Sequence, residues 1–252
     1  MRYLFMTLIL LTVTVPAKAE ESSTDLSIYL FAAALDGDAQ VRGVTSDVDV
    51  PFSTILENLD LGFMGFVEHR RGDWSFIGDI AYLKLEDENT SATDGNLVIE
   101  VDTTLEQTVI EGFVAYRIFE DQPETTQMSL DLLAGLRHTS LEIDLRTEAS
   151  LPGLDTSRSR SADEDWIDGV LGLRLKVGGE SGWGGMLWAD IGEGSDSSSY
   201  QLLALASYRG SGNWQFFGGY RLLNLEYDEG SDADLGIDID YNGPMLGAAY
   251  RL

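Results

Sequence analysis

Polar and apolar residues alternate along most of the chain from residue 25 onward. In IDGVLGLRLKV, residues 167–177, the odd-numbered positions carry Ile, Gly, Leu, Leu, Leu and Val, whereas the even-numbered positions carry Asp, Val, Gly, Arg and Lys. Residues 183–191 and 200–208 repeat this two-residue period. Because successive side chains of a strand point to opposite faces, the pattern predicts strands with two unlike faces. The exception is FSTILENL, residues 52–59, which predicts one short helix.

The alternation predicts ten strands. They cover residues 26–36, 59–70, 74–86, 97–118, 127–145, 166–178, 183–192, 200–209, 214–227 and 237–252. An even number of strands lets the first pair with the last, which leaves no open sheet edge. We therefore expect an all-β fold, a closed antiparallel up-and-down transmembrane β-barrel of about ten strands, with about eight or about twelve as the alternatives.

The two faces of these strands differ in a way that suits a lipid bilayer. The apolar face is bounded by aromatic residues, as at Trp183, Tyr200, Tyr208 and Trp214. The other face mixes single charges with glycine and aliphatic residues. A lipid-facing band with aromatic girdles around a partly filled lumen accounts for both traits. A periplasmic β-sandwich binding protein, which turns its apolar faces inward, is the alternative.

Short and long connections alternate along the chain. The short ones cover residues 71–73, 120–126, 179–182 and 210–213, and the mostly longer ones cover 37–58, 87–96, 146–165, 193–199 and 228–236. In outer-membrane barrels short turns face the periplasm and long loops face the outside. We therefore expect both termini on the periplasmic side.

The first residues predict export. Residues 1–19, MRYLFMTLILLTVTVPAKA, combine a charged start, an apolar run and a small-x-small cleavage site. A transmembrane helix needs about 20 apolar residues, so this run is too short, and no later stretch approaches that length. We expect a cleaved signal peptide over residues 1–19 and one barrel domain over residues 20–252, in the outer membrane of a Gram-negative bacterium.

The last strand resembles an assembly signal. The chain closes with GPMLGAAYRL, in which Gly247, Tyr250 and Leu252 match the carboxy-terminal signal of outer-membrane barrels, with Leu252 in place of the usual phenylalanine. The expected partner is the barrel-assembly machinery. We expect this strand to close the barrel and to reach the periplasmic rim.

Five segments carry a wider resemblance. They are VDVPFSTILENLDLGFMGFVEHRRGDWSFIGDIAYLKL, WIDGVLGLRL, ADIGEGSDSSSYQLLALASYR, GGYRLLNLEY and YNGPMLGAAYRL. The chain resembles, over nearly its whole mature length, a largely uncharacterised family of small proteobacterial outer-membrane β-barrel proteins grouped with OmpA- and OmpW-type barrels. Family members often carry Pro where this chain has Gly169. The resemblance implies location and fold, and it supplies no substrate or catalytic residue.

The net charge excludes one class of partner. Cleavage of the predicted signal peptide removes Arg2 and Lys18, so the mature chain carries 14 basic and 43 acidic residues and a formal charge of −29. Nucleic-acid binding is therefore not expected. About three quarters of this charge, −22, lies at residues 36–58, 86–100, 140–165, 193–199 and 226–240. The acidic residues of these segments form either a solvated surface that repels other negative surfaces or a surface that attracts cations and contacts lipopolysaccharide through divalent ions.

No cofactor or metal site is predicted. The chain has no cysteine, so neither a disulfide framework nor a cysteine-type zinc site is available. EYDEGSDADLGIDID, residues 226–240, is rich in carboxylates but lacks the spacing of an EF-hand calcium loop.

Charged residues within the strands form the candidate site. Assigning faces from the aromatic positions places twelve charged side chains in the lumen: Asp79, Glu111, Asp131, Asp168, Asp190, Arg117, Arg137, Arg174, Lys176, Arg209, Arg221 and Arg251. They either fill the lumen with ion pairs or line a narrow, non-specific pore. Arg174 and Asp168 lie roughly 20 Å apart on one strand, so each needs partners on other strands, and we expect Asp190 and Arg137 to supply them.

Catalysis is not expected. An outer-membrane enzyme that hydrolyses lipid or peptide bonds is the alternative, and it would need a histidine near an acid or a hydroxyl at one rim. His69 and His138 are the two histidines of the chain. His138 and Thr139 are adjacent on one strand and therefore point to opposite faces. The remaining expected partners are outer-membrane lipid and lipopolysaccharide, and the sequence sets no oligomeric state.

Overall fold

The strands pair in an order that closes on itself. The computed structural model describes residues 22–41, 44–93, 97–121, 126–151, 154–228 and 235–252, so the predicted signal peptide lies outside the described residues. The strands are β1 (Ser22–Phe31), β2 (Ala34–Val41), β3 (Val44–Val50), β4 (Leu59–Arg71), β5 (Trp74–Thr93), β6 (Leu97–Asp121), β7 (Thr126–Leu151), β8 (Leu154–Gly179), β9 (Trp183–Glu193), β10 (Ser197–Arg209), β11 (Trp214–Asp228) and β12 (Leu235–Arg251).

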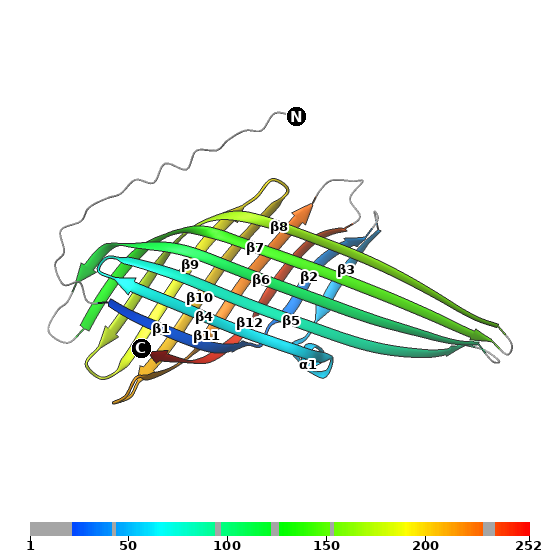
Figure 1. Ribbon diagram of the computed structural model, residues 1–252, viewed down its shortest axis with the longest axis horizontal. Helices are drawn as coiled ribbons and strands as arrows, with labels where there is room; N and C mark the ends of the chain where they lie inside the picture. Colours follow the sequence, from blue (N-terminus) through cyan, green and yellow to red (C-terminus); the bar gives the residue numbers. More distant parts are fainter. Residues whose placement is uncertain (1–21, 42–43, 94–96, 122–125, 152–153, 229–234) are drawn as a thin grey trace.

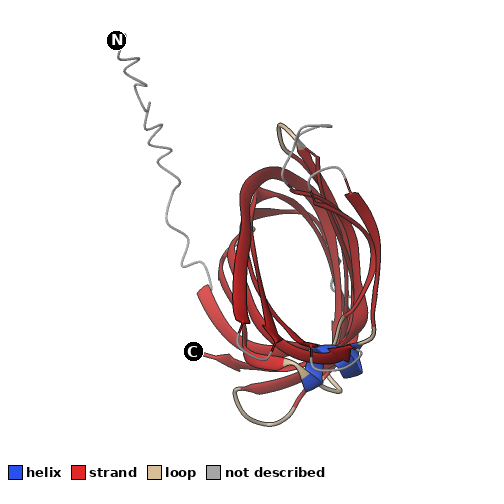
Figure 2. Ribbon diagram, turned by 90° about the vertical axis from the view of Figure 1, so that its right-hand side faces the viewer, coloured by secondary structure: helices blue, strands red, loops and turns tan. Residues whose placement is uncertain are grey.

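Ten of these strands form the barrel wall. Each pairs antiparallel with its neighbours in the order β1, β4 to β12, and β12 returns to pair with β1 from Asp25↔Arg251 to Phe31↔Met245. Figure 2 shows the resulting ring with the short helix α1 (Phe52–Glu57) at its wall. The predicted ten-stranded antiparallel barrel is confirmed. Among the described residues, no helix is long and apolar enough to cross a membrane.

The predicted first strand, residues 26–36, is wrong as a single element. It breaks at Ala32 and Ala33, and the chain continues as β2, which pairs with the other half of β12 and then with β3. The break lies opposite Gly243 and Pro244. Because proline has no N–H to donate, the ladder is interrupted there, and the Pro244 carbonyl accepts the N–H of Ala32 at 2.9 Å. The predicted connection 37–58 therefore contains most of β2 and all of β3 and α1.

Two other predicted connections are also mostly strand. β5 to β8 run through most of residues 87–96 and 146–165, and Figure 1 shows them extending beyond the other strands at one end. Residues such as Glu86 and Thr104 still pair across β5 and β6. The sequence pattern did not predict these extensions, because residues on both faces of the strands are mostly polar there. The alternation of apolar and polar residues therefore stops, although the backbone pairing continues.

The outer wall is apolar and carries an aromatic belt at the end where the short turns lie. Ile28 and Leu246 are each 65% exposed on it. Next to the short turns, Trp74 contacts Tyr116, Trp183 contacts Tyr208, and Trp214 contacts Tyr250, with ring centroids 4.7, 5.1 and 5.0 Å apart. Such a belt is typical of barrel surfaces at the membrane–water interface.

The turn between β4 and β5 depends on a glycine. Gly72 has φ of 58°, a left-handed conformation that costs other residues strain because of their Cβ atom. It lets Arg71 pair directly with Trp74 across a two-residue turn. The predicted short turn at residues 71–73 is thus present, and it sets the register of the two strands.

Deleting Tyr250–Leu252 should prevent assembly of the barrel. The deletion removes the N–H groups of Arg251 and Leu252, which donate to the carbonyls of Asn213 and Thr24 at 3.0 and 2.9 Å. It also leaves carbonyl groups of the neighbouring strands unpaired near lipid, where each costs several kcal/mol. We expect little folded protein in the outer-membrane fraction. The control Leu252→Phe should assemble normally, and normal levels of the truncated protein would contradict the role of this strand in closure.

Candidate functional site: charged clusters inside the barrel

Seven of the twelve predicted lumen residues are buried inside the barrel. They are Glu111, Asp131, Arg137, Asp168, Arg174, Asp190 and Arg221, each at most 4% exposed. Asp79, Arg117, Lys176 and Arg209 are partly buried on the same inward faces. The strand period explains this placement, because each inward residue is separated from the next by one residue that points to lipid.

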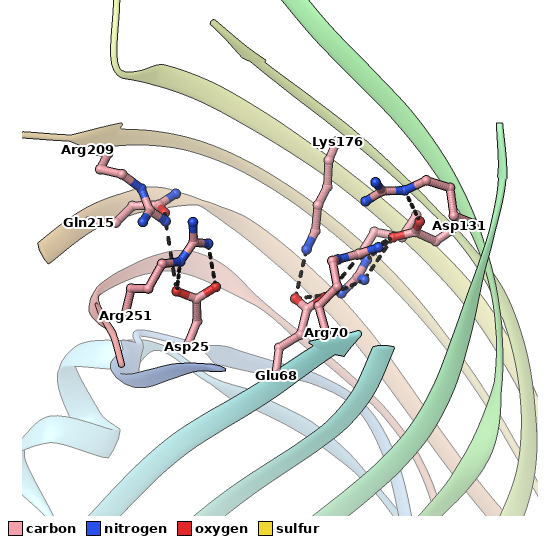
Figure 3. A network of polar contacts seen from close by, with 10 residues as sticks. Asp25, Glu68, Arg70, Asp131, Lys176, Arg209, Gln215 and Arg251 are labelled. Carbon is pink, nitrogen blue, oxygen red and sulfur yellow. Dashed lines mark hydrogen bonds and ion pairs between the residues drawn. The ribbon is translucent and has the colours of Figure 1, made fainter. Parts of the chain in front are cut away.

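Arg174 organises the first group of charges, which we call the Arg174 cluster: Glu68, Arg70, Arg117, Asp131, Arg174 and Lys176. The Nη2 atom of Arg174 lies 2.9 Å from Glu68 Oε1 and 2.9 Å from Asp131 Oδ2. Figure 3 shows side chains of this cluster converging from β4, β7 and β8. Lys176 Nζ lies 2.7 Å from Glu68 Oε2, and Arg70 Nη2 lies 3.0 Å from Asp131 Oδ2. Each carboxylate therefore contacts at least three cationic groups.

Arg137 organises the second group, which we call the Arg137 cluster: Asp79, Glu111, Arg137, Asp190 and Arg221, with Tyr29, Ser199 and Gln201. Arg137 donates from Nε to Glu111 at 2.6 Å, from Nη2 to Asp190 at 2.9 Å and from Nη1 to Ser199 at 2.8 Å. Arg221 donates to the other oxygen of Glu111 at 3.2 Å. All three ends of the Arg137 guanidinium group are thus hydrogen-bonded, as a fully buried cation requires.

Trp188 joins the two clusters. Its ring lies under the Arg174 guanidinium group at 5.3 Å from the ring centroid, and its Nε1 donates to Asp190 at 2.6 Å. Phe113 packs edge-on against the same ring, with centroids 5.2 Å apart. The side chain of Trp188 therefore fills the space between the clusters and ties their charges together through its face and its N–H.

The two clusters and Asp168 together carry as many basic as acidic groups. The Arg174 cluster has four bases and two acids, and the Arg137 cluster has two bases and three acids. Asp168 adds a sixth acid and accepts hydrogen bonds from Ser197 and Ser199 at 2.5 and 2.6 Å. Six cations and six carboxylates thus lie together inside the barrel, and their formal charges balance.

The predicted partners of Arg174 and Asp168 are wrong. Arg174 binds Glu68 and Asp131 rather than Asp190, and Asp190 binds Arg137. Asp168 lies directly opposite Arg137 across β7 and β8, but its hydrogen bonds come from the two serines. Asp131 lies directly opposite Arg174 across β7 and β8. Glu68 reaches Arg174 from β4 across the lumen, and such contacts depend on strand tilt rather than on the order of strands along the sequence.

Arg251 and Arg209 form a separate group of charges at the end of the lumen. They lie at the rim beside Asp25 rather than in the buried clusters (Figure 3), and the Arg251 side chain is 44% exposed. Arg251 donates to both oxygens of Asp25 at 2.9 and 2.7 Å, which joins β12 to β1. Arg209 lies 3.9 Å from the same carboxylate. These contacts strengthen the seam where the barrel closes.

Sequence reasoning missed Glu68 and Arg70. Both lie in VEHRR, residues 67–71, at the end of the strand predicted over residues 59–70. The signal was present, because Glu68 and Arg70 share a face with Phe66 and oppose the outward-facing Val67. Tyr29, whose hydroxyl donates to Asp79 at 2.7 Å, was also missed, because the prediction of lumen residues covered charged side chains alone.

Neither histidine points into the lumen. His69 and His138 lie on outward faces, where His69 contacts Thr24 Oγ1 at 2.9 Å and His138 Nε2 lies 3.6 Å from Asp165. Within the part of the chain that the structure describes, no group of three or more metal-ligating side chains is arranged to hold an ion.

The barrel is similar to solved structures of outer-membrane proteins. The outer-membrane protease OmpT from Escherichia coli superimposes with a TM-score of 0.51 and 12% identity, over 91% of this chain and 97% of that chain. Ail, the attachment invasion locus protein of Yersinia pestis, gives a TM-score of 0.35 at 14% identity, over 92% and 99%. The toluene transporter TodX of P. putida gives 0.27 at 8%, over 92% and 90%. No protein-family profile and no curated protein sequence matches this chain. The similarity to OmpT supports an outer-membrane barrel fold.

Replacing Arg137 with methionine should destabilise the barrel strongly. The change leaves Glu111 and Asp190 buried with fewer partners, and breaking a buried ion pair from one side costs about 3–5 kcal/mol. The matched control is Arg146→Met on the same strand, because Arg146 is 62% exposed and pairs with Glu148 at the surface. That change should cost less than about 1 kcal/mol. Urea unfolding in lipid vesicles measures both, and equal costs would show that the Arg137 cluster is not a buried network.

Proposed function

We propose that this protein is an integral outer-membrane β-barrel with a sealed lumen, acting as a structural protein of the cell envelope rather than as a diffusion channel. The observation that carries the proposal is the complete burial of Arg137 and Arg174, whose side chains are 0% exposed. A guanidinium group that lined a water-filled pore would be hydrated. Here its hydrogen-bond donors bind carboxylates and a serine instead.

The side chains that close the lumen are in contact with one another. Trp188 contacts the Arg174 cluster through its ring and the Arg137 cluster through its N–H, so the two clusters are joined. Aromatic and aliphatic side chains including Phe113, Leu133 and Val170 fill the space beside them. Eight strands leave room for side chains alone and ten leave somewhat more, so large side chains such as these are needed to fill the interior.

We further propose that the barrel contacts lipid, lipopolysaccharide and the assembly machinery and that it is not an enzyme. Outer-membrane lipid would contact the apolar outer wall, lipopolysaccharide would contact the acidic outer end, and the assembly machinery would recognise the strand ending at Leu252. The grouping with OmpA- and OmpW-type barrels stays a prediction. The outward orientation of His69 and His138 supports a non-enzymatic protein, since neither lies beside the buried carboxylates.

The purified protein should be non-conducting in planar bilayers, and Arg174→Ala should leave it so. Trp188, Lys176 and Arg70 still occupy the lumen after this change, so stability should fall while conductance stays near zero. A wet pore would respond in the opposite way: unfolding would barely change, and ion preference would shift towards cations because one positive charge is lost. Single-channel recording and urea unfolding of the one variant separate the two functions.

The folded protein should be heat-modifiable. A closed barrel has no free strand edge and resists SDS, so unboiled and boiled samples should migrate differently on a gel. The protein should also fractionate with outer membranes. Identical migration together with solubility in buffer alone would contradict the membrane assignment.

A further inference from the structure

The barrel wall is incomplete between β1 and β4. Their pairing ends at Ile28↔Gly65, although β4 continues beside β5 as far as Leu59↔Leu85. Beyond that point the N–H of Phe31 donates to the sulfur of Met64 at 3.3 Å instead of to a backbone carbonyl. A thioether is a weak acceptor, so this contact marks a place where the two strands have separated.

A cavity of about 150 Å³ lies at this gap. Its lining includes Phe31 and Leu223 from the inside of the barrel, and Leu30 from the outside. Tyr29, Leu30 and Phe31 are consecutive residues of one strand, so a cavity that all three line passes around the strand edge. Leu30 and Leu56 are 51% and 55% exposed on the apolar outer surface. The cavity therefore connects the interior of the barrel with the lipid-facing side of the wall.

The lining is almost entirely apolar, and three of its residues carry polar side-chain groups deep in the wall: Gln107, Tyr241 and Arg221. The amide nitrogen of Gln107 donates to the hydroxyl oxygen of Tyr241 at 2.7 Å. Arg221, whose side chain is 5% exposed, also lines the cavity, and its buried Nε–H has no hydrogen-bond partner among the described residues. A buried donor without a partner costs free energy that an acceptor on a ligand would recover.

The surrounding charge selects against an anion. Arg221 belongs to the Arg137 cluster, in which three carboxylates already outnumber two guanidinium groups. A negatively charged ligand would add a second surplus negative charge to this one cluster, where burial makes it costly. An uncharged acceptor, such as a hydroxyl or a carbonyl, satisfies the free N–H without that cost.

We propose that this cavity binds an uncharged, single-chain hydrocarbon molecule that carries one hydrogen-bond acceptor and that enters from the lipid between β1 and β4. A cavity of this volume holds a molecule the size of benzene, about six carbon atoms. A longer chain would extend through the gap into the surrounding lipid. The site does not depend on whether the lumen conducts ions.

The test uses two photoactivatable probes in phosphatidylcholine vesicles. One is decanol with a diazirine in its chain, and the other is decanoic acid with the same label, ionised at pH 8. Mass spectrometry then locates the labelled residues of the folded full-length protein. The decanol probe should label Met64 and Leu223 inside the wall as well as outward residues such as Leu246. The acid should label the inner residues at least tenfold less, with outer labelling unchanged.

A glycine pair supplies a matched variant and control. A Cβ atom on Gly62 would find its nearest neighbour, Leu59 Cδ1, at 3.5 Å, an ordinary contact, and Gly62→Phe places a ring at the cavity lining. A Cβ atom on Gly112 meets nothing within 4 Å on the outer wall, so Gly112→Phe adds the same ring elsewhere. Gly62→Phe should lower inner labelling at least tenfold, and Gly112→Phe should not.

The outcomes are decisive for each part of the proposal. Labelling confined to outward residues in the wild type, or unchanged inner labelling in Gly62→Phe, would overturn the site. Equal inner labelling by the acid would overturn the preference for an uncharged ligand. Heat-modifiability confirms that each variant has folded, and Ala33→Leu, at another residue of the cavity lining, replaces Gly62→Phe if the latter does not fold.

Discussion

The structure depends on one constraint: inside a bilayer every backbone N–H and C=O must find a partner within the protein. A sheet can satisfy this requirement by closing, and here β12 pairs with β1 while Arg251 holds Asp25 across the same seam. Closure in turn creates an interior that lipid does not reach. The contents of that interior are then set by a second rule, because charges removed from water need partners of opposite sign.

The two charged clusters show how that rule is met. Arg137 and Arg174 each use several donors, and each buried carboxylate of the Arg174 cluster contacts more than one cation. Trp188 couples the clusters through both its ring and its N–H. Such a network contributes specificity as well as stability, because shifting any strand by one residue would turn its lumen charges towards lipid.

The gap between β1 and β4 is where the first constraint is relaxed. Pro244 interrupts the ladder on β12, the chain leaves the wall at Ala32, and β2 continues along β12 instead of β4. Met64 and α1 partly occupy the space that regular pairing would have closed. Complete pairing of the strands thus closes the sheet and encloses the charged side chains. The missing pairing between β1 and β4 leaves the lateral cavity.

The sequence by itself determined the strand period, the ten-stranded barrel and the inward face of most lumen charges. These properties follow from neighbours along one strand, where alternation fixes the face of each side chain. Tertiary structure alone decided that Arg174 meets Glu68, that Asp190 meets Arg137, and that residues 26–36 break into two strands. Contacts across the lumen depend on strand tilt and stagger, and the break depends on a proline far away in sequence. Neither the tilt nor that pairing is encoded in the pattern of any single segment.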